Sequence, residues 1–320
     1  MAAPSVSLVV PTYNEAANIE HVLDDALAQT ARPNELLLVD NDSTDSTVEM
    51  ARAHRIGQQI AVRILRNPRR GCIAGSLNLA LASAEGDILV RWDGHSRYPP
   101  TYIGACLEIF DATPAACVGG RQVCVGHSAW GRSIAWATSS VFGVGAAPYK
   151  TTPGGGAREA DTVYLGAYRT DPLRALGGWN EKWLVNEDYE LNVRLREAGR
   201  SIVFDPRIHA LYSVRSTLGA LVRQQFRYGY WRARTVRAHP HTMSLRLAAP
   251  PALVLVIALS LLLAIGATRW ALAPIILYLA AQALVASRPV EGTNFGRRLA
   301  SLLGLHVPWG VGFLCGFGRP

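Results

Sequence analysis

Short apolar runs alternate with helical patterns over the first hundred residues. The runs "SVSLVVP", "ELLLVD", "VRILR" and "DILVRW" are rich in branched aliphatic residues, as buried strands are. Between them, the spacing of apolar residues predicts helices over about residues 18–29, 43–54 and 75–84. Strands and helices that alternate in this way predict an α/β fold with a mostly parallel sheet and helices on both faces.

Polar residues follow three of these predicted strands. They are "PTYNE" at residues 11–15, "DNDSTD" at residues 40–45 and "DGH" at residues 93–95. Ligands bind at the carboxyl ends of the strands in such sheets, so we expect one binding site there. Each motif alone is also compatible with an ordinary loop.

Two of these loops contain good helix caps. Asn14 or Asn18 would cap the first helix, and Ser43 would cap a second helix that begins at Thr44. These capping roles are the alternative to ligand binding.

The third motif contains the residue types of a metal site. In an extended chain Asp93 and His95 point the same way, because they are two residues apart. A carboxylate oxygen and a neutral imidazole suit Mn²⁺ or Mg²⁺, and the nitrogen favours Mn²⁺. Two protein ligands leave coordination positions that a diphosphate could fill. The alternative is that Asp93 caps the next element and His95 is simply exposed.

Two later stretches differ in character. Residues 117–172 are rich in Gly, Ser, Thr and Ala, with "TTPGGGAREAD" at residues 151–161 as the most loop-like part, and we expect a mobile or disordered segment there. A helix is expected over about residues 188–198, where Gly199 ends it.

The C-terminal third is basic and then apolar. Residues 215–237 are a basic, aromatic amphipathic helix candidate, whereas residues 247–287 contain one charge, Arg269. That charge separates two apolar spans of about 20 residues, the length that crosses a bilayer, so a transmembrane hairpin is expected. Arginines flank both outer ends, which favours a cytoplasmic location for the rest of the chain. Residues 299–317 could form a third crossing, a re-entrant segment or an interfacial helix.

The net charge indicates classes of binding partner, and the cysteines indicate the redox compartment. The formal net charge is +8, mostly from arginine, which suits nucleic acid, a membrane surface or a phosphorylated substrate. The five cysteines form no C-x-x-C pair, so zinc sites and a disulfide framework are not expected and a reducing compartment is. The N-terminus lacks a basic region before its apolar run and predicts a strand, without a signal peptide.

Five motifs, in this order, resemble those of a known family. They are "VVPTYNEAANIEHVLDDALAQT", "LLVDNDSTDST", "GSLNLALASAEGDILVRWDGHSRYP", "GGWNEKWLVNEDYELNVRLREAG" and "RQQFRYGYW". Together they cover about residues 5–237 and resemble the inverting family 2 glycosyltransferases of the GT-A fold. The likeness is strongest to bacterial membrane-associated members of the succinoglycan glucosyltransferase type. The resemblance implies a GT-A catalytic domain at residues 1–214, and the basic and apolar patterns above predict a juxtamembrane helix region at 215–246 and membrane helices at 247–320.

The resemblance implies a role for each matched position on the donor side. It places Pro11, Tyr13 and Glu15 around the nucleoside, and Asp40 against the base or ribose. Arg70 and Gly71 match a loop that closes on the nucleotide. Asp93 and His95 occupy the D-x-D position, with His95 in place of the usual second Asp, and Asn41 also departs from the common paired aspartates.

The resemblance also implies the catalytic and acceptor residues. Asp188 falls where the family keeps its general base, with Glu187 second; an inverting transfer needs one carboxylate to deprotonate the acceptor hydroxyl. The alternative is that both are acidic residues favoured by the dipole of the helix they begin. Four residues match the family's Q-Q/R-x-R-W motif, which lies near the acceptor and the diphosphate in processive relatives: Gln224, Gln225, Arg227 and, in place of Trp, Tyr228. The alternative here is a helix at the membrane surface. His209 could reach the metal or diphosphate, or be structural.

These observations predict a membrane-anchored transferase. It would move a sugar from a nucleotide sugar, most simply a UDP-sugar, to a polyprenyl-linked acceptor in exopolysaccharide or cell-envelope assembly, on the cytoplasmic side of the membrane. One alternative is a polyprenyl-phosphate sugar synthase similar to dolichyl-phosphate sugar synthases. A second is a non-catalytic protein that binds anionic lipid or nucleic acid; converging carboxylates disfavour it, because they repel a polyanion, and we expect no nucleic-acid partner.

Overall fold

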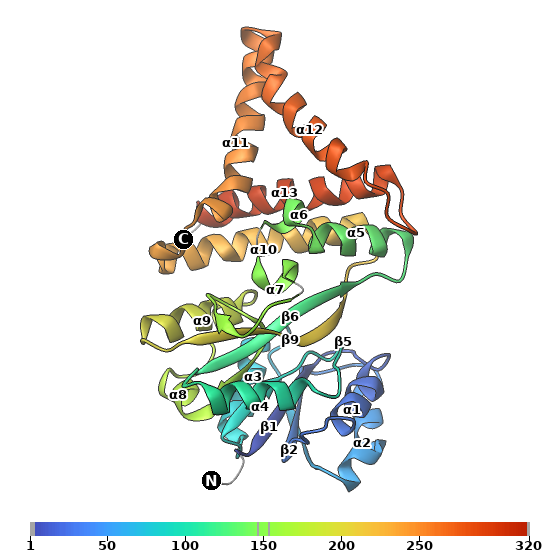
Figure 1. The fold of residues 1–320 in the computed structure, drawn as a ribbon, viewed down its shortest axis with the longest axis vertical. Coiled ribbons are helices and arrows are strands. Elements are labelled where there is room, and N and C mark those ends of the chain that lie inside the picture. Colours follow the sequence, from blue (N-terminus) through green and yellow to red (C-terminus); the bar gives the residue numbers. More distant parts are fainter. Residues whose placement is uncertain (1–3, 146, 153, 319–320) are drawn as a thin grey trace. The chain divides into compact units, whose positions relative to one another are not determined.

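The computed structural model describes residues 4–145, 147–152 and 154–318. The chain forms two compact units (Figure 1). The first contains residues 1–123 and 152–212, and the second contains residues 124–151 and 213–320. Residues 124–151, which the sequence analysis grouped with residues 1–214, belong to the second compact unit.

A nine-stranded sheet forms the centre of the first unit. Its order is β3-β2-β1-β4-β8-β6-β9-β5, with β7 paired to β9. The strands are β1 (Val6–Thr12), β2 (Glu35–Asp40), β3 (Ala61–Arg66), β4 (Ile88–Arg91), β5 (Ser96–Arg97), β6 (Cys117–Val125), β7 (Arg158–Glu159), β8 (Tyr164–Arg169) and β9 (Ile202–Ser213). Strands β1 to β4 are parallel, as expected, and β8 continues the sheet in the antiparallel direction.

Helices cover the sheet of the first unit. They are α1 (Ile19–Leu27), α2 (Thr47–Ala53), α3 (Ile73–Ser83), α4 (Tyr102–Ala112), α8 (Thr170–Ala175) and α9 (Glu187–Glu197), with the short η1 (Arg55–Gln58). Strand β2 is buried along its whole length, which explains its uninterrupted apolar run. Helix α9 ends before Gly199, which has φ +71°, as the sequence predicted.

The register of the parallel strands brings the polar motifs to one edge. Thr12 lies beside Asp40, and Asp40 lies beside Arg66 on the next strand. On the other side of β1, Val9 lies beside Arg91, the last residue of β4. The segments after β1, β2 and β4 therefore leave the sheet together at its carboxyl edge.

The stretch expected to be a disordered loop contains regular structure. Residues 117–172 include β6, β7 and β8, and also α5 (Ala129–Ser139), α6 (Val141–Val144) and α7 (Pro148–Thr151). The expectation was therefore wrong for these elements, and some of the glycines here are needed for close packing. A Cβ on Gly120, for example, would overlap the carbonyl group of Ile208. Between α7 and β8, by contrast, the two-residue β7 is the only regular element among the described residues.

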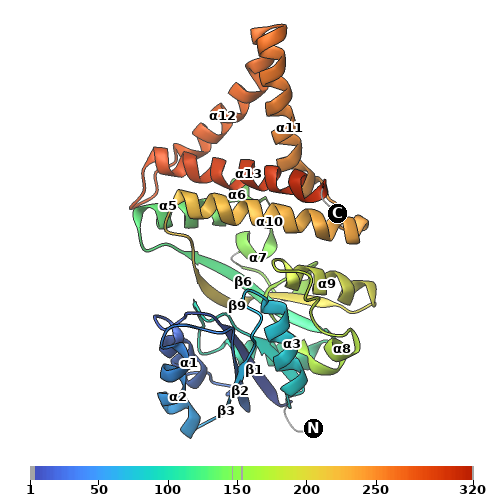
Figure 2. The ribbon, with the colours of Figure 1, turned by 180° about the vertical axis from the view of Figure 1, so that it is seen from behind.

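The second unit is helical. Beyond α5 to α7 it contains α10 (Leu218–Ala238), η2 (Pro240–Thr242), α11 (Leu245–Gly266), η3 (Arg269–Leu272), α12 (Ala273–Ala286) and α13 (Phe295–Phe317). Helices α10 and α13 lie side by side in both views (Figures 1 and 2), and α11 and α12 form a hairpin. Three segments of the described chain are long and apolar enough to cross a membrane: Leu245–Gly266, Arg269–Ala286 and Phe295–Phe317.

Candidate active site

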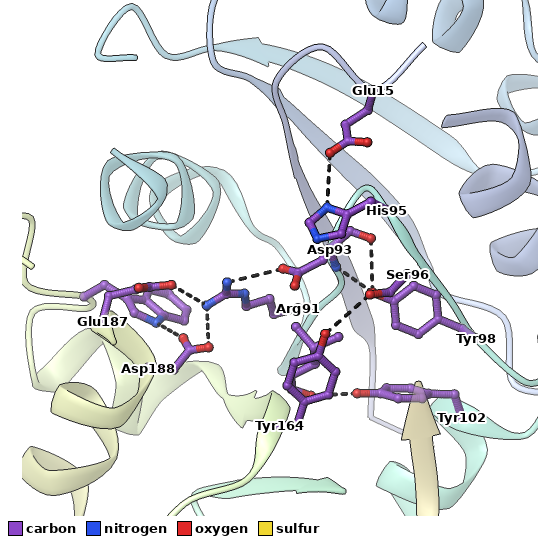
Figure 3. Close-up of polar contacts among 12 residues, drawn as sticks. Glu15, Arg91, Asp93, His95, Ser96, Tyr98, Tyr102, Tyr164, Glu187 and Asp188 are labelled. Carbon is purple, nitrogen blue, oxygen red and sulfur yellow. Dashed lines mark hydrogen bonds and ion pairs between the residues drawn. The ribbon is translucent and has the colours of Figure 1, made fainter. Parts of the chain in front are cut away.

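Arg91 joins the polar residues of two distant segments. Its guanidinium contacts Asp93 Oδ1 through Nη2 at 3.3 Å and Glu187 Oε1 through Nη1 at 3.0 Å, and Nη1 also forms an ion pair with Asp188 (Figure 3). The Arg91 side chain is only 6% exposed. A buried charge is costly unless it is paired, so these three carboxylates account for its burial. The "DGH" motif and the "NED" motif of the sequence therefore meet in the structure.

Glu187 and Asp188 occupy the first turn of α9. Asn186 precedes them in the left-handed conformation, with φ +64°, and this turn directs both side chains to Arg91. Asp188 accepts a hydrogen bond from Trp179 Nε1 at its other oxygen, at 2.9 Å, so both of its carboxylate oxygens are held.

The two carboxylates differ in burial. The Glu187 side chain is 9% exposed and that of Asp188 is 22% exposed. Burial raises the pKa of Glu187, Arg91 opposes that rise, and the negative charge of Asp188 adds to it. Asp188 is therefore the carboxylate with greater access to solvent and substrate.

Asp93 and His95 lie in a turn, which corrects the expectation of an extended pair. The backbone bends at Gly94 and His95, and Ser96 N donates to the Asp93 carbonyl at 3.4 Å. Asp93 faces Arg91, whereas His95 Nδ1 lies 3.1 Å from Glu15 Oε1 (Figure 3). The "PTYNE" loop and the "DGH" loop are therefore in contact.

Asp93 and His95 supply side-chain donors of the types that bind Mn²⁺ or Mg²⁺. Among the residues the structure describes, no group of three or more His, Cys, Asp and Glu side chains could hold a metal ion. In the tautomer with its proton on Nδ1, His95 donates to Glu15, and a carboxylate partner of this kind is typical of metal-binding histidines. Asp93 supplies a carboxylate oxygen, the donor that Mn²⁺ and Mg²⁺ prefer. These two residues could thus hold one side of an ion.

Aromatic side chains pack beside the turn and form hydrogen bonds with it. Tyr98 stacks on Trp92 with ring centroids 3.8 Å apart, and both rings are buried. The backbone N–H of Asp93 donates to the Tyr98 hydroxyl at 2.6 Å, and that hydroxyl lies 3.1 Å from the Asp93 carbonyl. Burial raises the pKa of Tyr98, so its hydroxyl stays protonated and can donate to this carbonyl. Tyr164 approaches Ser96 on the same loop, with 3.4 Å between the two hydroxyl oxygens.

The loops after β1 and β2 are bound to each other. Asn14 N donates to Ser43 Oγ at 2.9 Å, and Thr44 N donates to Asn14 Oδ1 at 2.8 Å. The expected cap at Ser43 is therefore wrong: α2 begins at Thr47, and Asp45 accepts from the Thr47 backbone instead. Asn18 occupies the N-cap position of α1 without a capping hydrogen bond from its side chain.

The residues matched to nucleotide binding lie around these loops. Pro11 is in β1, Tyr13 follows it with 46% exposure, and Asp40 ends β2 and accepts from Ser43 N. Arg70 pairs with Asp42 at 2.9 Å, and Gly71 has φ +72°, a conformation that glycine adopts without strain. All of these residues belong to the first unit.

The matched acceptor motif lies in the second unit, on α10. Gln224 Nε2 donates to the Tyr228 hydroxyl at 3.1 Å, Gln225 is buried, and Arg227 is exposed. His209, in β9, has its Nδ1 3.0 Å from the carbonyl of Arg207 on the same strand.

Sequence reasoning missed two residues of the site, Arg91 and Trp179. Arg91 was treated as part of a buried strand, although an arginine among Ile88–Arg91 is itself a signal, since a buried arginine needs acidic partners. Trp179 lies in "GGWNEKW" and gave no signal of its own. Its indole reaches Asp188 because Asn78 of α3 holds the Trp179 backbone at both N and O.

Comparison with known proteins identifies the family. The model described as "Glycosyl transferase family 2" matches residues 7–153, and "Glycosyl transferase family group 2" matches residues 165–285. The chain is 33% identical over 273 residues to the succinoglycan biosynthesis protein ExoA of Rhizobium meliloti, which covers 83% of this chain and 80% of that protein. This chain belongs to glycosyltransferase family 2.

Other relatives and solved structures agree with this assignment. The O-antigen chain rhamnosyltransferase WbaN of Salmonella anatum is 28% identical over 70% of this chain and 69% of its own. The mannosyltransferase PcManGT of Pyrobaculum calidifontis, solved in complex with GDP-Man and Mn²⁺, superposes with a TM-score of 0.61 at 20% identity, over 95% of this chain and 86% of its own. S. aureus TarS 1–349 in complex with UDP gives 0.53 at 16%, over 94% of this chain and 89% of its own. The transferase therefore has the GT-A-like fold that its sequence predicted.

Proposed function

We propose that this glycosyltransferase inverts the anomeric centre as it moves a sugar from a nucleotide sugar to a polyprenyl-linked acceptor at the cytoplasmic face of a membrane. The observation that supports this most directly is the cluster around Arg91, which brings Asp93 of the donor motif and Asp188 of the base motif to one guanidinium. The residues that bind the donor and the base that activates the acceptor must lie within a few ångströms of each other. The two motifs meet at this cluster.

Asp188 is the proposed general base. The acceptor hydroxyl attacks the anomeric carbon, its proton passes to an Asp188 oxygen, and the bond from that carbon to the diphosphate oxygen breaks on the opposite face. Asp188 is preferred over Glu187 because its side chain is more exposed and because Trp179 and Arg91 fix its orientation. Each carboxylate oxygen that accepts one hydrogen bond still has a lone pair for the hydroxyl proton.

The donor lies across the loops at the carboxyl edge of the sheet in this proposal. Pro11, Tyr13, Glu15 and Asp40 surround the nucleoside, and Arg70 with Gly71 closes over it. Asp93 and His95 hold a divalent ion, Mn²⁺ or Mg²⁺, which when bound would neutralise charge on the departing diphosphate. We take a UDP-sugar as the donor and a GDP-sugar as the alternative. One solved neighbour is a complex with UDP, and another is a complex with GDP-Man.

The acceptor and the location are inferred from the second unit and from the relatives. Three apolar helices offer a membrane anchor, and Gln224, Gln225, Arg227 and Tyr228 on α10 are proposed to contact the acceptor or diphosphate. One relative is a succinoglycan biosynthesis protein, and another is an O-antigen chain rhamnosyltransferase. A lipid-linked saccharide in exopolysaccharide or envelope glycan assembly suits both.

A polyprenyl-phosphate sugar synthase is the second candidate. A dolichol-phosphate mannosyltransferase of Pyrococcus furiosus is 29% identical over 37% of this chain and 33% of its own. In that reaction the lipid phosphate itself would be the nucleophile. The shorter match makes it the weaker of the two.

One experiment separates these functions. The full chain in nanodiscs is supplied with a panel of UDP- and GDP-sugars, with Mn²⁺ or EDTA, and with either polyprenyl phosphate or a polyprenyl-diphosphate sugar. We expect Mn²⁺-dependent release of UDP that is stimulated by the diphosphate-linked acceptor. Glycosylation of polyprenyl phosphate alone would establish the second candidate, and an absence of nucleotide release from every donor would refute a transferase function for this site.

A further inference from the structure

Arg91 contacts more carboxylates than a buried structural arginine needs, and all of them belong to the proposed catalytic site. One carboxylate is enough to compensate a buried guanidinium, yet three contact Arg91, and one of them, Glu187, lies 96 residues from Arg91 in the chain. With all three carboxylates ionised, the cluster would carry a net charge of −2. Such an excess is unfavourable for stability alone, since like charges repel at these distances.

The contacts are divided between the two halves of the proposed site. Nη2 contacts Asp93, on the donor side, whereas Nη1 contacts Glu187 and Asp188, on the acceptor side. The planar guanidinium therefore sets the distance and the angle between the two groups of carboxylates. The Nε atom of Arg91 is buried and has no hydrogen-bond partner among the described residues. The orientation of the guanidinium therefore satisfies the carboxylates through Nη1 and Nη2 and leaves Nε without a partner.

We infer that Arg91 is a positioning residue that couples cation binding at Asp93 to the placement of the base Asp188. This inference deepens the proposed function and rests on it. Arg91 does not touch the reacting atoms. It shares its positive charge between Asp93 and the α9 carboxylates, so a change on one side alters its interaction with the other.

A double-mutant cycle on Mn²⁺ affinity tests the coupling. The dissociation constant for Mn²⁺ alone is measured by electron paramagnetic resonance on the full chain in nanodiscs. In Asp188→Asn, less of the Arg91 charge is neutralised, so Asp93 is held more strongly by Arg91, and we expect Mn²⁺ to bind about five-fold more weakly. In an Arg91→Met background the same Asp188→Asn change should alter the affinity by less than about two-fold.

Turnover of the Arg91 variants separates positioning from folding. Arg91→Met should lower kcat for transfer about 10²-fold, with a much smaller change in the donor KM and without loss of Mn²⁺ affinity. A folding defect would lower activity and Mn²⁺ affinity together. Arg91→Lys keeps a charge and is the safer variant for folding; one ammonium group cannot span both sets of carboxylates, so its kcat should fall while its Tm is retained.

Arg63 provides a matched control. It also joins two carboxylates, Glu35 and Glu85, but Glu35 begins β2 at the sheet edge opposite the site. Arg63→Met should leave both Mn²⁺ affinity and kcat of the folded protein unchanged. An equal effect of Asp188→Asn on Mn²⁺ affinity with and without Arg91, no effect in either background, or native kcat in Arg91→Lys would overturn the inference.

The two proposals fail in different ways. If the native chain consumes no nucleotide sugar, the proposed function is wrong, and the Mn²⁺ cycle still reports on the coupling by binding alone. If the native chain is active but the cycle shows no coupling, the transferase function stands and the role of Arg91 falls.

Discussion

A substitution of Asp188 tests the catalytic proposal most directly. Asp188→Asn keeps the shape of the side chain and its contact with Trp179, but it removes the proton acceptor. We expect transfer to fall by about 10²- to 10⁴-fold, the usual contribution of a general base, while UDP or GDP binding is retained. Calorimetric titration of the nucleotide together with a transfer assay checks both halves. Turnover near the native rate would remove Asp188 from the base role.

Glu187 makes stability depend on pH in a defined direction. Burial raises its pKa above the usual value of 4.5, so the folded protein binds a proton there more tightly than the unfolded chain does. Stability is therefore lost as pH rises from the unfolded pKa through the raised folded value. We expect Glu187→Gln to raise Tm relative to the native protein at pH 8 and to have a smaller effect at pH 4. A Tm difference that shrinks as pH rises would contradict this.

His95 and Glu15 test the metal site from two sides. His95→Ala should weaken Mn²⁺ binding because a ligand is lost, and Glu15→Gln should weaken it about ten-fold because the ring loses its carboxylate partner. Tyr13, in the same loop and exposed, offers the control Tyr13→Phe, which should leave affinity for Mn²⁺ alone unchanged. Native Mn²⁺ affinity in His95→Ala would return His95 to a surface role.

At the level of elements, the pair of α10 and α13 depends on glycine. A Cβ on Gly312 of α13 would overlap the carbonyl oxygen of Phe226 on α10, and one on Gly316 would overlap that of Tyr230. Backbone atoms cannot move aside as a side-chain tip can, so the two helices would have to separate.

Gly312→Ala should therefore destabilise the second unit by about 1–3 kcal/mol. Gly266→Ala is the matched control, because nothing lies within 4 Å of its Cβ position at the end of α11. Thermal unfolding of both variants in the same detergent measures the difference. Equal Tm values would show that the close approach of α10 and α13 does not contribute to stability.

The elements that sequence predicted best are those with strong local signals. The strands β1, β2 and β4 and the helices α1, α3, α9 and α10 lie where periodicity placed them, to within a few residues. Residues 117–172 were misjudged because β6 and β8 are antiparallel strands in the middle of the sheet, and their small residues pack against neighbours that are distant in sequence. Composition alone does not distinguish glycine needed for packing from glycine in a loop.

At the scale of the whole molecule, three segments of the described chain are long and apolar enough to cross a membrane, and a substitution in α11 tests whether it does so. Leu255, near the middle of α11, is 57% exposed, as are many of its apolar neighbours to a similar degree. If α11 spans a bilayer, Leu255→Arg costs about 2.5–3.5 kcal/mol of insertion free energy, and less protein should resist extraction with carbonate. Leu211→Arg, at an exposed position of β9, should leave membrane association unchanged. Unaltered extraction of Leu255→Arg would argue against a spanning α11.

The sequence by itself determined the order of strands and helices, the apolar helices and the polar motifs at the ends of the strands. These features depend on local periodicity and on motifs of a few residues. Only the tertiary structure decided which of these residues meet. Arg91 looked like one residue of a buried strand, and its role as the link between Asp93 and Asp188 follows from the packing of α9 against the carboxyl edge of β4. Contacts between segments so far apart in the chain depend on how the sheet and its helices pack, and no local pattern records them.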